Sequence, residues 1–186
     1  MLNYKKIDMN TTFKILSLML IVSVVSMGGC LKKLTTANFD HTTTGEITTE
    51  EVDKAGEFSI GETTLTSTLK DELNKNNTAA NLVDALKLRS AEVSIAENQT
   101  LKNFDAIDNA ELYISADNQP EVLLASVNPV QKDKSTISFV VSNNTNLMSY
   151  LNGNTFTISI KGKTNGPLQV VKLNVKAIWT VTASAK

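Results

Sequence analysis

The chain has little cysteine, histidine, proline or aromatic residue among its 186 residues. It contains one Cys, one His and three Pro, and aromatic residues make up 5% of it. A single Cys excludes an intramolecular disulfide and a thiolate metal cluster, and a single His excludes a zinc site with two His ligands. The formal net charge of −1 at pH 7 provides no basic surface of the kind that binds nucleic acid. We therefore expect a fold stabilised by apolar packing, with no metal, no cofactor and no nucleic-acid partner.

Catalytic motifs are equally sparse. No Gly-rich phosphate loop occurs, and a Ser-His-Asp arrangement would have to be built around His41, which we interpret as a polar strand residue near the N-terminus. The carboxylates at residues 50–53 and 71–72 lie in polar runs, without the spacing that predicts a glycosidase cleft. The sequence therefore predicts a protein that is not an enzyme.

The N-terminus carries a long apolar run with distinctive borders. It has a basic start at Lys5, Lys6 and Lys14, an apolar stretch at residues 15–27, and a small-residue end at Gly28, Gly29 and Cys30. The apolar stretch would span roughly 20 Å as a helix, which is too short for the ~30 Å core of a membrane. The pattern is typical of an export signal, with Met9 as an alternative start.

The segment Met27-Gly28-Gly29-Cys30 resembles the lipobox of bacterial lipoproteins. The resemblance implies cleavage between Gly29 and Cys30 and a diacylglycerol joined to the Cys30 sulfur, which holds the protein on a lipid bilayer. It divides the chain into a signal peptide (1–29), a lipidated N-terminus and tether (30–36) and a β domain (37–186). The alternatives are a plain secretory signal followed by an incidental Cys, or a helix end with a buried thiol.

The resemblance also implies an address in the cell envelope. Surface lipoproteins of the Bacteroidota tend to carry an acidic run after the cysteine, whereas here Leu31-Lys32-Lys33-Leu34 follows it. This departure favours a periplasm-facing position on the outer membrane over display at the surface. The expected partners are the bilayer, through acylated Cys30, and an unknown envelope protein or glycan.

Beyond the signal, apolar residues alternate with polar ones in a pattern typical of β-strands. The clearest case is the tail, where apolar side chains occupy every second position at Val171, Leu173, Val175, Ala177, Trp179 and Val181. This period of two predicts a long central strand with Trp179 in the core. Further strands are expected at 57–62, 85–95, 110–115, 121–127, 137–141 and 156–160. Residues 31–50 are either a tether or a first strand around 37–43 followed by a loop, and we favour the strand.

Two segments depart from this alternation and predict short helices. Leu65, Leu69 and Leu73 recur at four-residue spacing, and Thr68 is placed to cap a helix that ends at Asn76-Asn77. A further turn is expected at 78–83, and another where Leu147 and Leu151 pack inward.

These elements predict a mostly β fold, an antiparallel β-sandwich of about seven or eight strands with one or two short helices between strands, and the resemblance given next implies that the sandwich is immunoglobulin-like. The stretch LNGNTFTISIKGKTNGP, running into the Trp-bearing strand, resembles small uncharacterised immunoglobulin-like β-sandwich lipoproteins of the Bacteroidota. This overall likeness implies no site residue.

Few residues are candidates for a ligand site. Tyr113 and Tyr150 are candidate ligand-facing aromatics, and Asp105, Asp108 and Asn109 form a weak calcium candidate in a loop before a strand. We expect a non-catalytic, membrane-anchored envelope lipoprotein that acts as a binding or structural module. The alternative is a carbohydrate- or solute-binding accessory lipoprotein of an uptake system.

Overall fold

A computed structural model describes residues 36–142 and 144–184, so the predictions for the signal segment, the cleavage site and Cys30 lie outside the described residues. The described chain is mostly β, as predicted. Its strands are β1 (Thr36–Thr48), β2 (Gly56–Thr66), β3 (Val83–Ile95), β4 (Ile107–Ala116), β5 (Gln119–Val127), β6 (Thr136–Val141), β7 (Thr155–Thr164) and β8 (Lys172–Ser184). Its helical segments are α2 (Leu69–Lys75), the 3₁₀ turn η1 (Ala80–Leu82) and α3 (Met148–Leu151).

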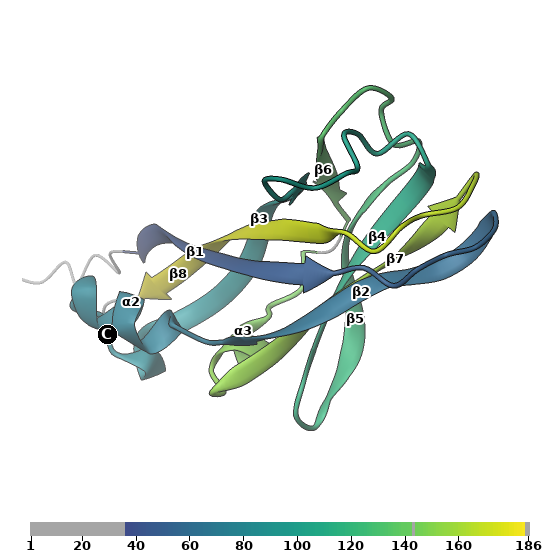
Figure 1. Cartoon of the computed structure of the whole chain (residues 1–186). Helices are drawn as coiled ribbons and strands as arrows, with labels where there is room; N and C mark the ends of the chain where they lie inside the picture. The colour runs from purple at the N-terminus through teal and green to yellow at the C-terminus, as the bar shows by residue number, and fades with distance from the viewer. Residues whose placement is uncertain (1–35, 143, 185–186) are drawn as a thin grey trace, which may run out of the picture. The chain divides into compact units, whose positions relative to one another are not determined.

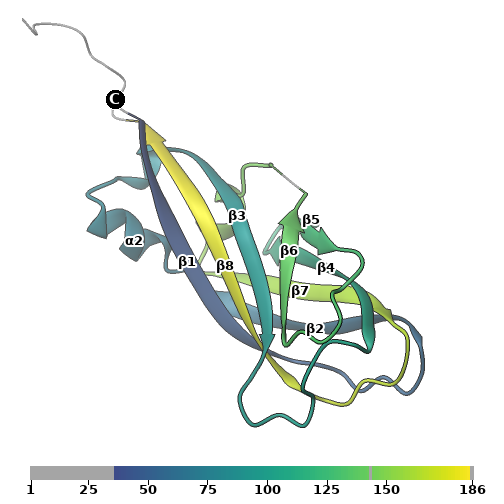
Figure 2. The same cartoon turned by 90° about the horizontal axis from the view of Figure 1, so that it is seen from above.

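The eight strands form one continuous antiparallel sheet in the order β1-β8-β3-β6-β5-β4-β7-β2. Strand β6 makes the sheet continuous, because it pairs with β3 through four residue pairs and with β5 through two. The sheet curls into a half-barrel, and Figure 2 shows β1, β8 and β3 crossing over β7 and β2. The predicted antiparallel strands are confirmed, but the two separate sheets of a sandwich are not, since β6 joins both halves.

Strand β8 confirms the alternation in the tail. All six apolar side chains of the alternating set are buried, and Trp179 is 0% exposed. The indole Nε1 of Trp179 donates a hydrogen bond of 3.0 Å to Oγ1 of Thr43 on β1. Because β8 pairs with β1 on one side and β3 on the other, it is an interior strand that brings its apolar face into the core.

Strand β1 is longer than predicted. It extends over Thr36–Thr48 rather than 37–43, and every one of its residues is paired with β8. The first-strand interpretation of this segment is therefore confirmed over the long-tether alternative. The polar Thr-rich sequence remains a strand because the ladder to β8 supplies hydrogen bonds along its whole length.

The helix α2 begins later than its sequence pattern indicated. Leu69 and Leu73 are buried as predicted, but Leu65 lies in β2, where it pairs with Phe156 of β7. Thr68 precedes the helix without making a side-chain cap. The other predicted turns are confirmed as η1 and as α3, and both Leu147, which precedes α3, and Leu151, its last residue, are buried. None of the described helices is long and apolar enough to cross a membrane.

The two outermost strands of the sheet, β1 and β2, approach each other at Gly45. A Cβ atom at Gly45 would lie 2.5 Å from Cδ2 of Leu65, so a larger residue there would require the Leu65 side chain to move. Just beyond β1, the backbone N–H of Glu50 donates to the carbonyl of Ile60 at 3.3 Å. At the end of the sheet where β1 begins and β8 ends, Figure 1 shows α2 beside them.

Candidate binding surface on the outer face of the sheet

The outer face of strands β5, β4, β7 and β2 carries a row of polar side chains. On β4 and β7 the inward positions are apolar and buried, as at Leu112 and Ile160. The alternate positions point outward, and the register places Glu111 opposite Lys161 and Tyr113 opposite Ser159. The same alternation that builds the core therefore collects these polar groups on the outside.

Five of these residues form one network, in which two hydrogen-bonded sets are joined by a cation–π contact. The Tyr113 hydroxyl donates to Oε2 of Glu111 at 2.6 Å, and the Ser159 hydroxyl donates to Oε1 of Glu121 at 2.9 Å. The Lys161 ammonium donates to Oε2 of Glu121 and lies 4.5 Å from the centre of the Tyr113 ring. Tyr113 and Glu111 are partners on the same strand, whereas Glu121 on β5 reaches across β4 to Ser159 and Lys161 on β7.

The network sets the protonation of two of its members. The hydrogen bond to Glu111 raises the pKa of Tyr113 to about 12, because losing the phenolic proton would leave two anions in contact. The hydrogen bond from Lys161 lowers the pKa of Glu121. At neutral pH Tyr113 is therefore a neutral donor and Glu121 a charged acceptor.

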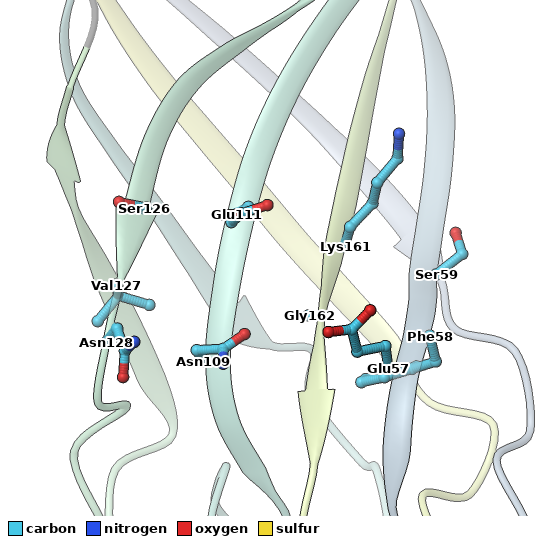
Figure 3. A pocket seen from close by; sticks show the side chains of 10 residues that line it. All are labelled: Glu57, Phe58, Ser59, Asn109, Glu111, Ser126, Val127, Asn128, Lys161 and Gly162. Atoms are coloured by element: carbon cyan, nitrogen blue, oxygen red, sulfur yellow. The ribbon is translucent and has the colours of Figure 1, made fainter.

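An open hollow of about 590 Å³ lies beside this network and is shown in Figure 3. We name it the Gly162 hollow; its lining residues are Glu57, Phe58, Ser59, Asn109, Glu111, Ser126, Val127, Asn128, Lys161 and Gly162. In Figure 3 the Glu57 side chain turns toward Gly162, whereas Lys161 extends away from it. The hollow therefore presents mainly carboxylate, amide and hydroxyl groups.

Gly162 allows β7 and β4 to come close at the hollow. A Cβ atom at this position would lie 2.3 Å from the backbone oxygen of Asn109, well inside contact distance. The glycine is consequently required by the packing of two strand backbones, and all the polar side chains around it except that of Asn128 are held on paired strands.

Most of the polar groups around the hollow are unpaired. Within the described part of the chain, no side-chain hydrogen bond is formed by Glu57, Ser59, Asn109, Ser126 or Asn128. The network members Glu111 and Lys161, in contrast, are engaged. The free groups include donors and acceptors together, and this combination is what the surface offers to a ligand.

The two candidate tyrosines have different places in the structure. Tyr113 lies on the outer face with its ring beside the Lys161 ammonium. Tyr150 is only 5% exposed, and its hydroxyl donates to the carbonyl of Pro120 at 2.9 Å. Tyr150 is therefore not a ligand-facing aromatic, because α3 directs its ring into the core rather than to the surface.

The calcium candidate is divided between two places. Asn165 donates to Oδ1 of Asp108 at 2.8 Å and to the carbonyl of Asp105 at 3.0 Å, and the Lys132 ammonium donates to the same carbonyl at 2.8 Å. Asn109 lies on β4 and lines the Gly162 hollow instead. Among the described residues, no group of three or more His, Cys, Asp or Glu is placed to hold a metal ion. The oxygens of Asp105 and Asp108 instead accept hydrogen bonds from the Asn165 amide and the Lys132 ammonium.

His41 is a strand residue, as predicted, but it is buried. It is 2% exposed on the inner face of β1, and its Nε2 has no hydrogen-bond partner among residues 36–142 and 144–184. Burial lowers its pKa, with an opposing contribution from Glu72 and a supporting one from Lys75 on α2. Its neighbours on the same face of β1 include Thr43 and Ile47, which are also buried, so the strand alternation explains its direction.

Sequence analysis did not identify Glu121 and Lys161 as partners. They are 40 positions apart in the chain and meet only because β5, β4 and β7 are neighbours in the sheet. Alternation indicates that both residues face outward, but it does not indicate which strands lie side by side.

No protein-family model matches the chain, and no curated protein matches it. Two solved structures share distant similarity. An acidic stable capsid structure of Helicobacter pylori bacteriophage KHP30 is 6% identical, with a TM-score of 0.35, and the match covers 82% of this chain and 99% of that one. A structure of Desmodium yellow mottle tymovirus is 8% identical, with a TM-score of 0.24, over 84% of this chain and 88% of that one. At these scores the likeness carries no functional meaning.

Proposed function

We propose that the protein is a lipid-anchored lipoprotein of the bacterial cell envelope that acts by binding rather than by catalysis. The observation that carries this proposal is the segment Met27-Gly28-Gly29-Cys30, which ends an apolar run of export-signal length at the only Cys of the chain. We place the protein on the outer membrane facing the periplasm, because Lys32 and Lys33 stand where an acidic run would favour surface display.

The distance between the anchor and the folded unit supports a role near the bilayer. Strand β1 begins at Thr36, six positions after Cys30. At about 3.3–3.6 Å per residue this segment spans at most about 20 Å. Acyl chains contribute about 0.8 kcal/mol per buried methylene, and two or three chains give stable attachment. An acylated Cys30 would therefore keep the β domain close to a membrane.

The chemistry of the outer face supports binding over catalysis. A general acid or base works best with a pKa near the operating pH. The network moves the pKa of Tyr113 upward to about 12 and that of Glu121 downward, both away from neutrality. Groups tuned in this way hold their protons or their charges, which suits a contact surface.

The test of the anchor is the mass of the mature N-terminus and its location in the cell. In cells making the full chain, we expect the wild-type protein in the membrane fraction, with Cys30 as its N-terminal residue carrying acyl groups. Cys30→Ser should leave the signal uncut or release the protein to the soluble fraction. Ser26→Ala, which changes the same segment without touching the lipobox cysteine, is the matched control and should remain in the membrane. An unmodified sulfur on a mature N-terminus would overturn the proposal.

A second function is favoured by the Gly162 hollow. Its unpaired carboxylate, amide and hydroxyl groups suit a carbohydrate- or solute-binding accessory that holds its ligand near an uptake system. A purely structural module would need no such set of free groups in one hollow. Binding of a small ligand at this place distinguishes the two.

A further inference from the structure

We infer that the Gly162 hollow is a binding site for a neutral saccharide. This inference rests on the second proposed function and names its site and ligand class. The free side chains of Glu57, Asn109 and Asn128 supply acceptors and amide donors, and those of Ser59 and Ser126 supply both. Each hydroxyl of a sugar is also both donor and acceptor, so it can pair with any member of this set.

Charge at the hollow disfavours anionic ligands. Glu57 and Glu111 both line it, while the charge of Lys161 is directed to Glu121. The exposed Lys163 is not a lining residue, but it lies at the border of the hollow in register with Glu57 and Asn109. An incoming carboxylate or phosphate would meet two carboxylates in the lining and one lysine at its border, and like charges in proximity are unfavourable. A neutral ligand therefore suits this lining better than an acidic glycan or a nucleotide.

A divalent cation also fits poorly. Calcium takes six to eight oxygen ligands, whereas two carboxylates line the hollow. One of them, Glu111, already accepts the Tyr113 hydroxyl at 2.6 Å. A neutral ligand rich in hydroxyls is what remains.

Size and shape agree with a short saccharide. The hollow of about 590 Å³ falls within the range of roughly 300–1,000 Å³ for small-molecule sites. Phe58 and Val127 also line it, but both are half-buried and pack against the core, so contacts to a sugar would come mainly from the polar side chains. Because the hollow is open and mostly polar, and because Tyr113 is covered by Lys161, we expect weak binding with a Kd on the order of 1 mM.

The test is saturation-transfer NMR on the full chain in micelles of a polyoxyethylene detergent, which contains no sugar. The probes are the neutral trisaccharides maltotriose, cellotriose and chitotriose, with trigalacturonate as an anionic comparison. We expect transfer to at least one neutral trisaccharide and none to trigalacturonate. The outer-face residue Glu57 should matter, and Glu57→Gln should weaken binding about tenfold, because a neutral amide replaces a charged hydrogen-bond acceptor.

Two further variants locate the site. Ser59→Tyr places a large side chain in the hollow and should abolish transfer, whereas Glu92→Gln alters an exposed carboxylate on the outer face of β3 and should leave it unchanged. Far-ultraviolet circular dichroism tests whether each variant is folded. If Ser59→Tyr does not fold, Glu57→Gln, which preserves side-chain size, still tests the site.

Several outcomes would overturn the inference: no transfer to any neutral trisaccharide, transfer to trigalacturonate alone, or equal binding by the Glu57 and Glu92 variants. The same preparations are examined for acylation of Cys30. Acylated protein that binds no saccharide removes this site and leaves the lipoprotein proposal standing. Saccharide binding by protein with an unmodified Cys30 does the reverse.

Discussion

The hydrogen bond between Trp179 and Thr43 offers a quantitative test of how β8 is held against β1. Trp179 is 0% exposed, Thr43 is 8% exposed, and the indole N–H donates to the hydroxyl at 3.0 Å. Trp179→Ala removes a large buried ring and should lower the free energy of unfolding by about 3–5 kcal/mol. Thr43→Val keeps the shape of the side chain but leaves the indole N–H unpaired, which should cost about 1–3 kcal/mol.

A double-mutant cycle separates the hydrogen bond from the packing. Trp179→Phe removes the donor and retains an aromatic ring, so combining it with Thr43→Val leaves no unpaired polar group. The double variant should therefore be about 1 kcal/mol more stable than the sum of the single effects indicates. Urea unfolding followed by circular dichroism measures all four proteins, since Trp179 is the only Trp and fluorescence is lost with it. A neutral Thr43→Val and additivity within about 0.5 kcal/mol would refute the hydrogen bond.

Two further predictions concern the buried His41 and the close approach of strands at Gly162. Because burial lowers the pKa of His41 below 6.5, the unfolded chain takes up the proton first as pH falls. Stability should decline below about pH 6.5, by at most about 1.4 kcal/mol per pH unit, and His41→Leu should remove this decline in urea titrations between pH 6.5 and 5; equal slopes would contradict it. Gly162→Ala should force β4 and β7 apart and cost about 1–3 kcal/mol, with faster amide exchange at Asn109 and Ala110; unchanged exchange would mean that the strands do not approach so closely.

The strands could be predicted because one physical signal, alternation of apolar and polar residues, determined them. In β8 the apolar set runs without a break up to Val181, and all of it is buried. The signal failed where two patterns overlapped. Leu65 fits the four-residue spacing of Leu69 and Leu73, but its pairing with Phe156 across the β2–β7 ladder keeps it in a strand.

The half-barrel could not be predicted from local patterns. It depends on β6, a strand of six residues that leaves the ladder with β3 and joins β5 at Val140 and Val141. Periodicity in β6 correctly indicates that Ile137 and Phe139 face inward. It does not indicate that two halves of a sheet are connected there, because strand pairing is a long-range property.

The candidate site also depends on long-range strand pairing. Glu57, Asn109 and Lys161 come from β2, β4 and β7, and nothing in the spacing of these residues along the chain relates them. The sequence predicts only which side chains of a strand share a face. For Tyr113 this prediction was correct, since its neighbours Leu112 and Ile114 are buried. For Tyr150 no repeating pattern of apolar and polar residues was present, because a single helical turn is too short to define a face.

A weak site and a lipid anchor are compatible features if both proposals hold. A Kd on the order of 1 mM would hold little ligand for a single protein free in solution. Many copies confined to one membrane meet successive repeats of the same glycan chain, and linked binding events of this kind can raise the overall affinity by about 10² to 10⁴ without any new contact. An open hollow on the outer face of a rigid sheet suits this use, because a long chain can pass across it, whereas a closed pocket admits only an end. Release of the anchor in Cys30→Ser should therefore weaken retention of the protein on an insoluble polysaccharide far more than it changes binding of a trisaccharide.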